Sequence, residues 1–159
     1  MTKKHDELIS IIKKDHAEVK EIFKKLRNEE QAAAREKLVA KLYSEIEPHI
    51  TGEEESLYPA LTKSKDSEQT ALEALEEHHV AQTVLKELLD MPGNHERFQA
   101  KAAVLKELVY HHIEEEESEV FKAFKKVLNS EQAASVLDDF QKAKSHKKQT
   151  METPAAMAA

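Results

Sequence analysis

Apolar residues recur every three or four positions along most of this chain, and that spacing limits its fold more than any other feature. One such segment runs from about residue 6 to 27, and three more follow it up to about residue 128. In the first segment the apolar positions are Leu8, Ile11, Ile12, Val19, Ile22, Phe23 and Leu26. This spacing places them on one face of an α-helix. Four amphipathic helices joined by short links predict an all-α fold, an up-down-up-down four-helix bundle.

The composition and the end of the chain refine this prediction. With 159 residues and only two glycines, the chain has the size of one domain and few helix breakers. We expect the bundle to occupy residues 1–128 and a short fifth helix, residues 129–144, to pack across one end of it. Residues 145–159 show no periodicity, which predicts a disordered tail. Pro48 falls inside the second helix and predicts a bend there.

Cysteine content and charge exclude several classes of function. The chain has no cysteine, which excludes a disulfide framework, an iron–sulfur cluster and a thiol nucleophile, and fits a reducing cytoplasm. The net charge is −7, and lysines and glutamates are interspersed without a basic stripe for nucleic acid. The longest apolar runs are too short to cross a membrane. We therefore expect a cytoplasmic protein that binds neither nucleic acid nor membrane. Its oligomeric state stays open.

A repeat relates the second and fourth predicted helices. Residues 49–58, HITGEEESLY, align with residues 112–121, HIEEEESEVF. The first and third helices also match, because the pair Asp15-His16 aligns with Glu77-His78 and apolar residues follow at the same distances. The sequence therefore contains two copies of one helix pair.

The repeat also decides which histidine faces inward where two are adjacent. His78 is followed by His79, and His111 is followed by His112. Neighbouring residues lie about 100° apart around a helix, so only one of each pair can face the core. The alignment selects His78 and His112, and the reverse assignment is the alternative.

Six residues then project into the predicted core and are candidate metal ligands. They are His16, His49, Glu53, His78, His112 and Glu116. Two of the histidines have a glutamate four positions later, which places both side chains together on one helical face. A buried carboxylate is costly unless a partner compensates its charge. Two carboxylates and four imidazoles on four helices suit two adjacent metal ions. Imidazole alone would allow zinc, copper or nickel, whereas the mixed nitrogen and oxygen set favours two iron ions.

Interpretations without metal compete with this one. A single His-x-x-x-Glu on a helix is usually an exposed ion pair, and a helical bundle with a purely structural role is the simplest alternative. The neighbouring acidic residues Glu54, Glu55, Glu114, Glu115 and Glu117 indicate a solvated acidic face. Alternatively, they help iron to enter.

These motifs resemble the hemerythrin-like, or HHE cation-binding, family over roughly residues 5–128. The resemblance is carried by Asp15-His16, residues 49–59, Glu77-His78-His79 and residues 111–117. It implies a non-haem di-iron centre that is bridged by an oxo or hydroxo group and by two carboxylates. A ferritin-like site fits less well, because it needs Glu-x-x-His on two helices and only Glu76 and His79 have that spacing in the bundle.

Two departures from the oxygen-carrying members change the expected function. Those members have a further histidine one turn after the ligand of the third helix, where this chain has Gln82. Their acidic ligand on the fourth helix lies five residues after its histidine, whereas Glu116 lies four residues after His112. The chain is in this respect similar to bacterial members linked to nitric oxide, peroxide or iron repair. Gln82 leaves a position for water, for an external ligand, or for Glu45, which lies one turn before His49.

The resemblance implies a protein that binds or senses dioxygen or nitric oxide at the di-iron centre. The alternatives are an enzyme that dismutates peroxide, as a catalase does, and a protein for iron storage, donation or repair. Whether the protein is an enzyme stays open at this point.

Overall fold

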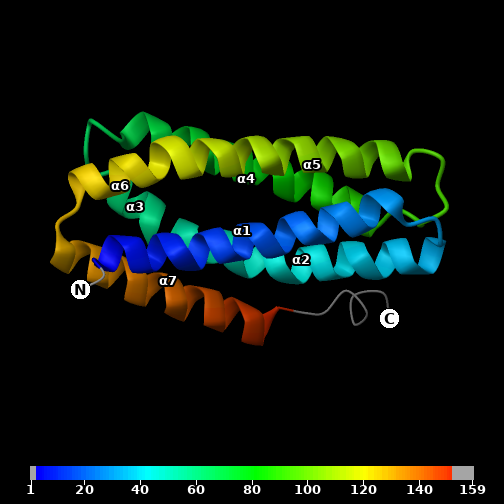
Figure 1. The fold of residues 1–159 in the computed structure, drawn as a ribbon, viewed down its shortest axis with the longest axis horizontal. Coiled ribbons are helices and arrows are strands. Elements are labelled where there is room, and N and C mark those ends of the chain that lie inside the picture. Colours follow the sequence, from blue (N-terminus) through cyan, green and yellow to red (C-terminus); the bar gives the residue numbers. More distant parts are fainter. Residues whose placement is uncertain (1–2, 152–159) are drawn as a thin grey trace.

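The computed structural model describes residues 3–151, and this part of the chain is helical, without a strand. Its long helices are α1 (Lys4–Asn28), α2 (Ala32–Glu55), α4 (Glu68–Leu89), α5 (Phe98–Glu115) and α7 (Ser130–Thr150). Its short helices are α3 (Leu57–Leu61), the π-helix η1 (Glu116–Val120) and α6 (Phe121–Val127). Helices α1, α2, α4 and α5 run alternately in opposite directions (Figure 1), which confirms the predicted up-down-up-down bundle.

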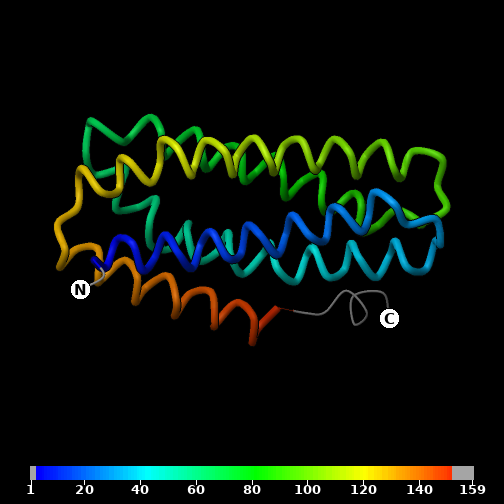
Figure 2. The backbone as a smooth tube through the Cα atoms, in the orientation of Figure 1, coloured from blue at the N-terminus to red at the C-terminus, as the bar shows by residue number. Residues whose placement is uncertain are grey.

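The helices are arranged as two neighbouring pairs with one additional helix outside. Helices α1 and α2 form the first pair, and α4 and α5 form the second (Figure 2). Helix α7 lies along the outside of the first pair, mainly against α2. None of the helices in the described part of the chain combines the length and the apolar character that a membrane span requires.

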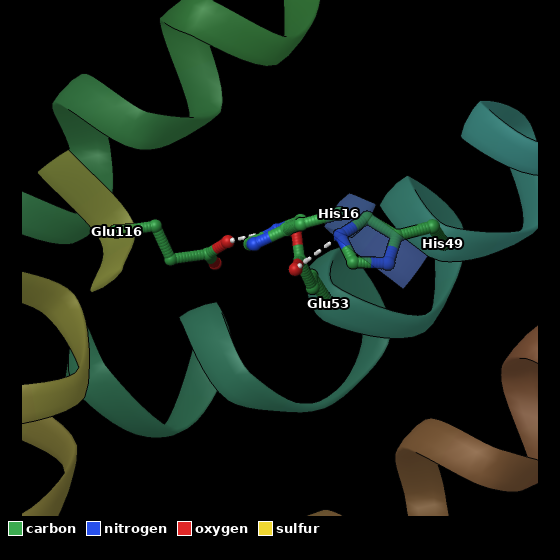
Figure 3. Close-up of side chains that lie close together, drawn as sticks. All are labelled: His16, His49, Glu53 and Glu116. Carbon is green, nitrogen blue, oxygen red and sulfur yellow. Dashed lines mark ion pairs between the residues drawn. The ribbon is translucent and has the colours of Figure 1, made fainter. Parts of the chain in front are cut away.

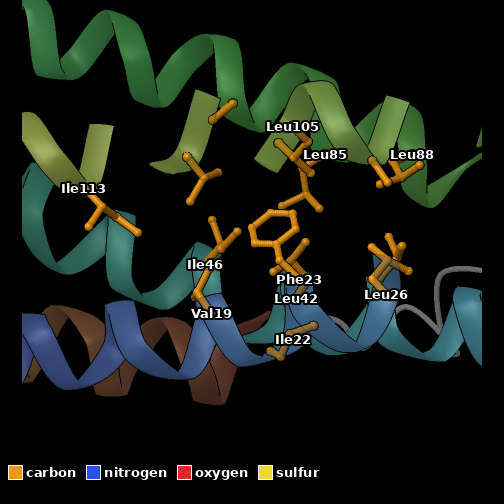
Figure 4. Close-up of a cluster of buried hydrophobic side chains, with 14 of the residues drawn as sticks. Val19, Ile22, Phe23, Leu26, Leu42, Ile46, Leu85, Leu88, Leu105 and Ile113 are labelled. Carbon is orange, nitrogen blue, oxygen red and sulfur yellow. The ribbon is translucent and has the colours of Figure 1, made fainter. Parts of the chain in front are cut away.

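Two clusters of buried apolar side chains hold the bundle together. One cluster (Figure 4) includes Val19, Phe23, Leu42, Leu85 and Leu105. The other includes Leu8, Ile12, Leu57, Phe124 and Phe140. Each fully buried side chain of this size contributes about 1.5–3 kcal/mol. His16 lies between Ile12 of one cluster and Val19 of the other, so the candidate ligands occupy the level at which the two clusters meet.

Two of the predicted helices are interrupted, at positions where the sequence pattern predicted no interruption. Helix α2 continues through Pro48 as far as Glu55, and the interruption follows at Ser56, which has φ −134° and ψ −71°. The predicted fourth helix is α5, η1 and α6 in succession, because the backbone adopts a π-helical turn from Glu116 onward. Single π-helical turns occur frequently at functional sites. One interruption begins at the candidate ligand Glu116 and the other three residues after the candidate ligand Glu53, which places the irregular backbone beside the site.

Helix α7 differs from the prediction in length and position. It extends to Thr150, so residues 145–150 of the predicted tail are helical, while residues 152–159 lie outside the described part of the chain. It runs along α1 and α2, and the prediction that it packs across one end of the bundle was wrong. The side chain of Phe140 and the lack of a side chain at Gly52 allow this position, because a Cβ atom at Gly52 would lie 2.8 Å from the Phe140 ring.

Replacing Phe140 by Ala is expected to lower the free energy of unfolding by about 3–5 kcal/mol, the usual cost of removing a buried aromatic ring. Phe140 is fully buried in the second apolar cluster and contacts Gly52 of α2. Urea unfolding of the metal-free protein measures the change. Gln141→Ala, at an exposed position of the same helix, is the matched control and should change the free energy by less than about 0.5 kcal/mol. Equal stability of the two variants would mean that α7 contributes little to the fold.

Candidate metal centre

The six predicted residues lie together in the middle of the bundle and are all buried. His16 comes from α1, His49 and Glu53 from α2, His78 from α4, His112 from α5 and Glu116 from the first position of η1. Their exposed fractions range from 0% for both glutamates to 8% for His112. In the two pairs of adjacent histidines, His78 and His112 are buried, as the repeat predicted. Their neighbours His79 and His111 are exposed.

One group of ligating atoms joins the two helix pairs across the bundle (Figure 3). His16, His49, Glu53 and Glu116 each offer one atom, and these atoms all lie within 4.8 Å of one another. Nε2 of His49 is 2.7 Å from Oε1 of Glu53, its neighbour one turn along α2. Nε2 of His16 is 3.1 Å from Oε2 of Glu116. This group can hold one metal ion.

A second group lies beside the first and shares Glu53 with it. Glu53, His78 and His112 again offer atoms within 4.8 Å of one another. Nε2 of His78 is 3.1 Å from Oε2 of Glu53 and 3.0 Å from Nε2 of His112. Nε2 of His112 is 3.8 Å from Oε2 of Glu116. Glu53 thus directs one oxygen to each group, as a bridging carboxylate must.

Every histidine of the centre has a carboxylate at its other ring nitrogen. The Nδ1–oxygen distances are 2.9 Å for His16 to Glu117, 2.9 Å for His49 to Asp15, 3.0 Å for His78 to Glu54 and 3.1 Å for His112 to Glu77. In a neutral imidazole, a carboxylate at Nδ1 assigns the proton to that nitrogen, so the lone pair of Nε2 is directed into the centre. Metal-binding histidines are oriented in this way in many proteins.

These outer carboxylates follow the same repeat as the inner residues. Asp15 and Glu77 occupy equivalent positions, and each binds the histidine of the next long helix. Glu54 and Glu117 are also equivalent, and each binds a histidine of the opposite helix pair. The sequence indicated a solvated face for Glu54 and Glu117. The signal that could have identified their role is their common position directly after the candidate ligands Glu53 and Glu116.

Four polar atoms of the centre have no hydrogen-bond partner outside the candidate ligands themselves within the described part of the chain. They are Nε2 of His16, both carboxylate oxygens of Glu53 and Oε2 of Glu116. An unsatisfied buried polar group costs about 1–3 kcal/mol, and more when it is charged. Here the orphaned atoms converge on one small space from α1, α2 and η1. The donor set therefore fits bound metal cations, which would satisfy all of these atoms together.

In the metal-free protein, protons supply the positive charge that these carboxylates require. Burial disfavours the charged form of His49, but the carboxylates of Glu53 and Asp15 outweigh this and raise its pKa to about 10. The pKa of His78 is raised to about 9 because Glu53 and Glu54 outweigh the effect of burial in the same way. Burial likewise opposes ionisation of Glu53, yet His49 and His78 hold its pKa well below the usual value. A metal ion must therefore displace protons when it binds.

Tyr58 makes the two halves of the centre unequal. Its hydroxyl donates a hydrogen bond of 2.6 Å to Oε1 of Glu116, and its side chain is fully buried. The residue at the equivalent position of the repeat is Phe121, which has no hydroxyl to donate to Glu53. Burial and the charge of Glu116 raise the pKa of Tyr58 well above its usual value, so the phenol keeps its proton.

A small apolar cavity adjoins the histidines. Its volume is about 40 Å³, and four of its lining residues are the candidate ligands His16, His49, His78 and His112. The apolar part of the lining is Val19, Ile46, Ile50, Ala81, Val109 and Ile113. The centre thus has a confined space beside it that is lined mainly by hydrocarbon.

Neither of the additional contacts considered from the sequence forms part of the two groups. The amide of Gln82 lies 3.3 Å from both carboxylate oxygens of Glu47 and donates to them. Glu45 is not among the atoms that converge on the centre. The position that holds a histidine in the oxygen carriers that the sequence resembles therefore has no substitute side chain in either group.

Lys144 of α7 extends the chain of contacts from the centre to the outer helix. Its ammonium lies 2.7 and 2.6 Å from the two oxygens of Asp15, which in turn accepts from Nδ1 of His49. Burial opposes ionisation of Asp15, but His49 and Lys144 together lower its pKa. The sequence pattern did not reveal this contact, since it joins residues 129 positions apart.

Replacing Lys144 by Met is expected to weaken metal binding by about tenfold, the lower end of the effect of removing a group that orients a ligand. Without the ammonium, Asp15 holds His49 in a less well-defined position. Competition with a chelator measures the affinity. Lys142→Met is the matched control, because Lys142 pairs with Asp138 on the exposed side of the same helix. An affinity that is unchanged in Lys144→Met would show that α7 does not support the centre.

Comparison with known proteins identifies the fold and the family. A solved structure, the Hemerythrin HHE cation binding domain-containing protein from Mycobacterium kansasii, superposes with a TM-score of 0.73 over 100% of both chains, at 19% identity, and therefore shares the fold. A DNA nickase from Nostoc sp. is 27% identical over 135 residues, which are 85% of this chain but only 38% of that protein. The family model of the hemerythrin HHE cation binding domain matches residues 7–124, which are most of the chain. The protein therefore belongs to the hemerythrin HHE cation-binding family.

Proposed function

We propose that this protein holds two iron ions between His16, His49, Glu53, His78, His112 and Glu116, and that it binds or senses dioxygen or nitric oxide beside them. The observation that carries the proposal is the convergence of four Nε2 atoms and two glutamates on one buried space, with a carboxylate behind each histidine. His16 and His49 would hold one ion, and His78 and His112 the other. Glu53 and Glu116 would bridge them.

The chemistry of the donor set supports iron over other metals. Two imidazoles and two bridging carboxylates would give each ion four donors from the protein; structural zinc sites are usually complete at four, whereas iron accepts this mixed nitrogen and oxygen set and can take further ligands. Magnesium and calcium prefer oxygen, and here four of six side chains offer nitrogen. When bound, iron would supply a centre that changes oxidation state and takes up small molecules. The protein's own residues orient the imidazoles and exclude bulk water.

The cavity beside the histidines supports a very small ligand. Its volume of about 40 Å³ is far below the roughly 300–1,000 Å³ of pockets that hold drug-sized ligands. A diatomic molecule fits, and a larger organic substrate does not. The apolar lining favours dioxygen or nitric oxide, because neither needs several hydrogen bonds to be held there.

A gas-binding experiment with a matched pair of variants tests this proposal. The reduced, iron-loaded protein is mixed with dioxygen or nitric oxide, and its absorption spectrum is followed by stopped flow. A new stable spectrum with one gas molecule per centre is expected. Ala81→Leu should weaken binding because Ala81 lines the cavity, whereas Ala74→Leu adds the same volume in the second apolar cluster and should not. No stable species with either gas, or binding that Ala81→Leu leaves unchanged, would contradict the proposal.

Dismutation of hydrogen peroxide is the second candidate function, and Tyr58 is the observation that favours it. Its buried hydroxyl keeps a proton next to Glu116, where a reaction of peroxide would need one. Oxygen evolution from peroxide would be measured with the iron-loaded protein and with Tyr58→Phe at equal iron content. Turnover that falls in the variant supports this function. Turnover no faster than that of the same concentration of free iron excludes it.

DNA nicking, which the name of the Nostoc relative states for that protein, is not part of the proposal. This chain spans only 38% of that protein's length. Its net charge of −7 opposes the approach of a phosphate backbone, since phosphate contacts supply most of the affinity in protein–DNA complexes.

A further inference from the structure

The residues that cover the outer side of the centre differ between the two halves of the repeat. In the first half, α7 covers the outer side, because Phe140 lies against Gly52 and Lys144 binds Asp15. In the second half, the residue that corresponds to Gly52 is Glu115. Within residues 3–151, helix α7 packs mainly against α1 and α2, on the side away from α4 and α5. The outer carboxylate of the first half, Asp15, is therefore covered by α7 and its side chain is 11% exposed, whereas that of the second half, Glu77, is 22% exposed.

The side of the bundle that α7 does not contact carries three side chains that can ligate a metal. His111 Nε2 lies 3.4 Å from Oε2 of Glu77 and 3.2 Å from Oε1 of Glu115. One atom of each residue lies within 4.8 Å of the others. The side chains of His111 and Glu115 are 63% and 47% exposed, whereas that of Glu77 is 22% exposed. One imidazole and two carboxylates are ligands that suit divalent iron and manganese.

Glu77 connects this outer group to the buried centre. Its Oε2 faces His111, and its Oε1 accepts a hydrogen bond of 3.1 Å from Nδ1 of His112. Glu77 also lines the apolar cavity together with His112. A single carboxylate thus contacts the exposed histidine with one oxygen and a candidate ligand of the centre with the other. The equivalent carboxylate in the first half, Asp15, is neutralised by Lys144 and cannot receive a cation in this way.

We infer that Glu77, His111 and Glu115 form an outer binding site for a divalent cation, through which iron(II) reaches the buried centre. This inference rests on the metal centre proposed above, but not on which small molecule that centre binds. The cation first exchanges part of its water shell for the exposed imidazole and carboxylate. Glu77 then offers it a negatively charged oxygen next to His112.

Manganese binding to the iron-loaded protein tests the outer site directly. With the centre filled, Mn²⁺ is added and the free ion is followed by electron paramagnetic resonance. One additional Mn²⁺ per chain is expected for the wild type, and none for the double variant His111→Ala/Glu115→Gln. The control is His79→Ala/Glu114→Gln, which removes an exposed histidine from α4 and an exposed carboxylate from α5, the two helices that carry the site, and should keep the site. Absence of an additional Mn²⁺ in the wild type, or equal binding by the two variants, overturns the inference.

The rate of iron uptake tests the route. Metal-free protein is mixed with iron(II) under anaerobic conditions, and incorporation is followed by quenching with a chelator. Uptake by His111→Ala/Glu115→Gln is expected to slow by about tenfold, the lower end of what a cluster of charges adds to an association rate. Its final iron content should equal that of the wild type and of the control variant.

Three other outcomes would overturn the inference, and they differ in what else they exclude. Equal uptake rates exclude the route and leave the metal centre standing. A final iron content that falls together with the rate means that His111 and Glu115 support the centre itself, which also excludes an entry role. A wild-type protein that takes up no iron overturns the proposed centre, and the route with it.

Discussion

Replacing Glu53 by Gln is expected to reduce metal affinity by at least about 100-fold, the upper end of the loss seen when a residue that only orients a ligand is removed. Glu53 is fully buried and directs one oxygen to His49 and the other to His78. Glutamine has nearly the same shape but no charge, and only one of its two terminal atoms can ligate a metal. Both ions therefore lose a shared anionic ligand in a single substitution.

The control for this variant is Glu55→Gln, two positions further along α2. Glu55 is exposed, so its substitution changes the net charge of the protein equally without touching the centre. Metal content after dialysis and competition with a chelator would be measured for both variants. The proposed centre predicts that only Glu53→Gln loses metal. A Glu53→Gln protein that still holds two ions with wild-type affinity would show that Glu53 does not bridge them.

The metal-free protein is expected to lose stability as the pH rises from about 6.5 to 10. The pKa of His49 is raised to about 10 and that of His78 to about 9 in the folded state, mainly because Glu53 outweighs the effect of burial. A histidine in the unfolded chain has a pKa of about 6.5. A raised pKa contributes stability that is complete below the unfolded value and is lost as the pH passes through the folded value. One pKa unit corresponds to about 1.4 kcal/mol, so the loss amounts to several kcal/mol.

Bound metal should remove this pH dependence, because the metal replaces the protons of the imidazoles. Urea unfolding between pH 6 and pH 10 would be compared for the chelator-treated and the metal-loaded protein. His49→Gln should flatten the profile of the metal-free protein, whereas His79→Gln, at an exposed position, should not. A metal-free wild type whose stability is constant or rises over this range would contradict the assigned electrostatics.

The sequence was sufficient to predict the bundle and the residues at its centre, because both follow from helical periodicity. His49 and Glu53 interrupt an apolar stripe, and so do His112 and Glu116, so the inward face of each helix could be read from spacing alone. The repeat then separated His78 from His79. The structure places all six residues at one level of the bundle, between the two apolar clusters.

The features that could not be predicted depend on contacts between distant helices. Which carboxylate reaches Nδ1 of a given histidine depends on how the helices are rotated and offset, as the contact of Glu117 with His16 shows. The π-helical turn that begins at Glu116 has no local signal such as proline or glycine. The position of α7 depends on Phe140 fitting over Gly52 and on Lys144 reaching Asp15. None of these relations has a fixed spacing in the sequence.

Metal analysis of the freshly purified protein tests the central claim most directly. The protein would be analysed for all first-row transition metals, then treated with a chelator, titrated with iron(II) under anaerobic conditions and analysed again. The proposed centre predicts two iron ions per chain that the chelator removes and the titration restores, and no such pair in Glu53→Gln. A wild-type protein that contains no stoichiometric metal and takes up none would contradict it.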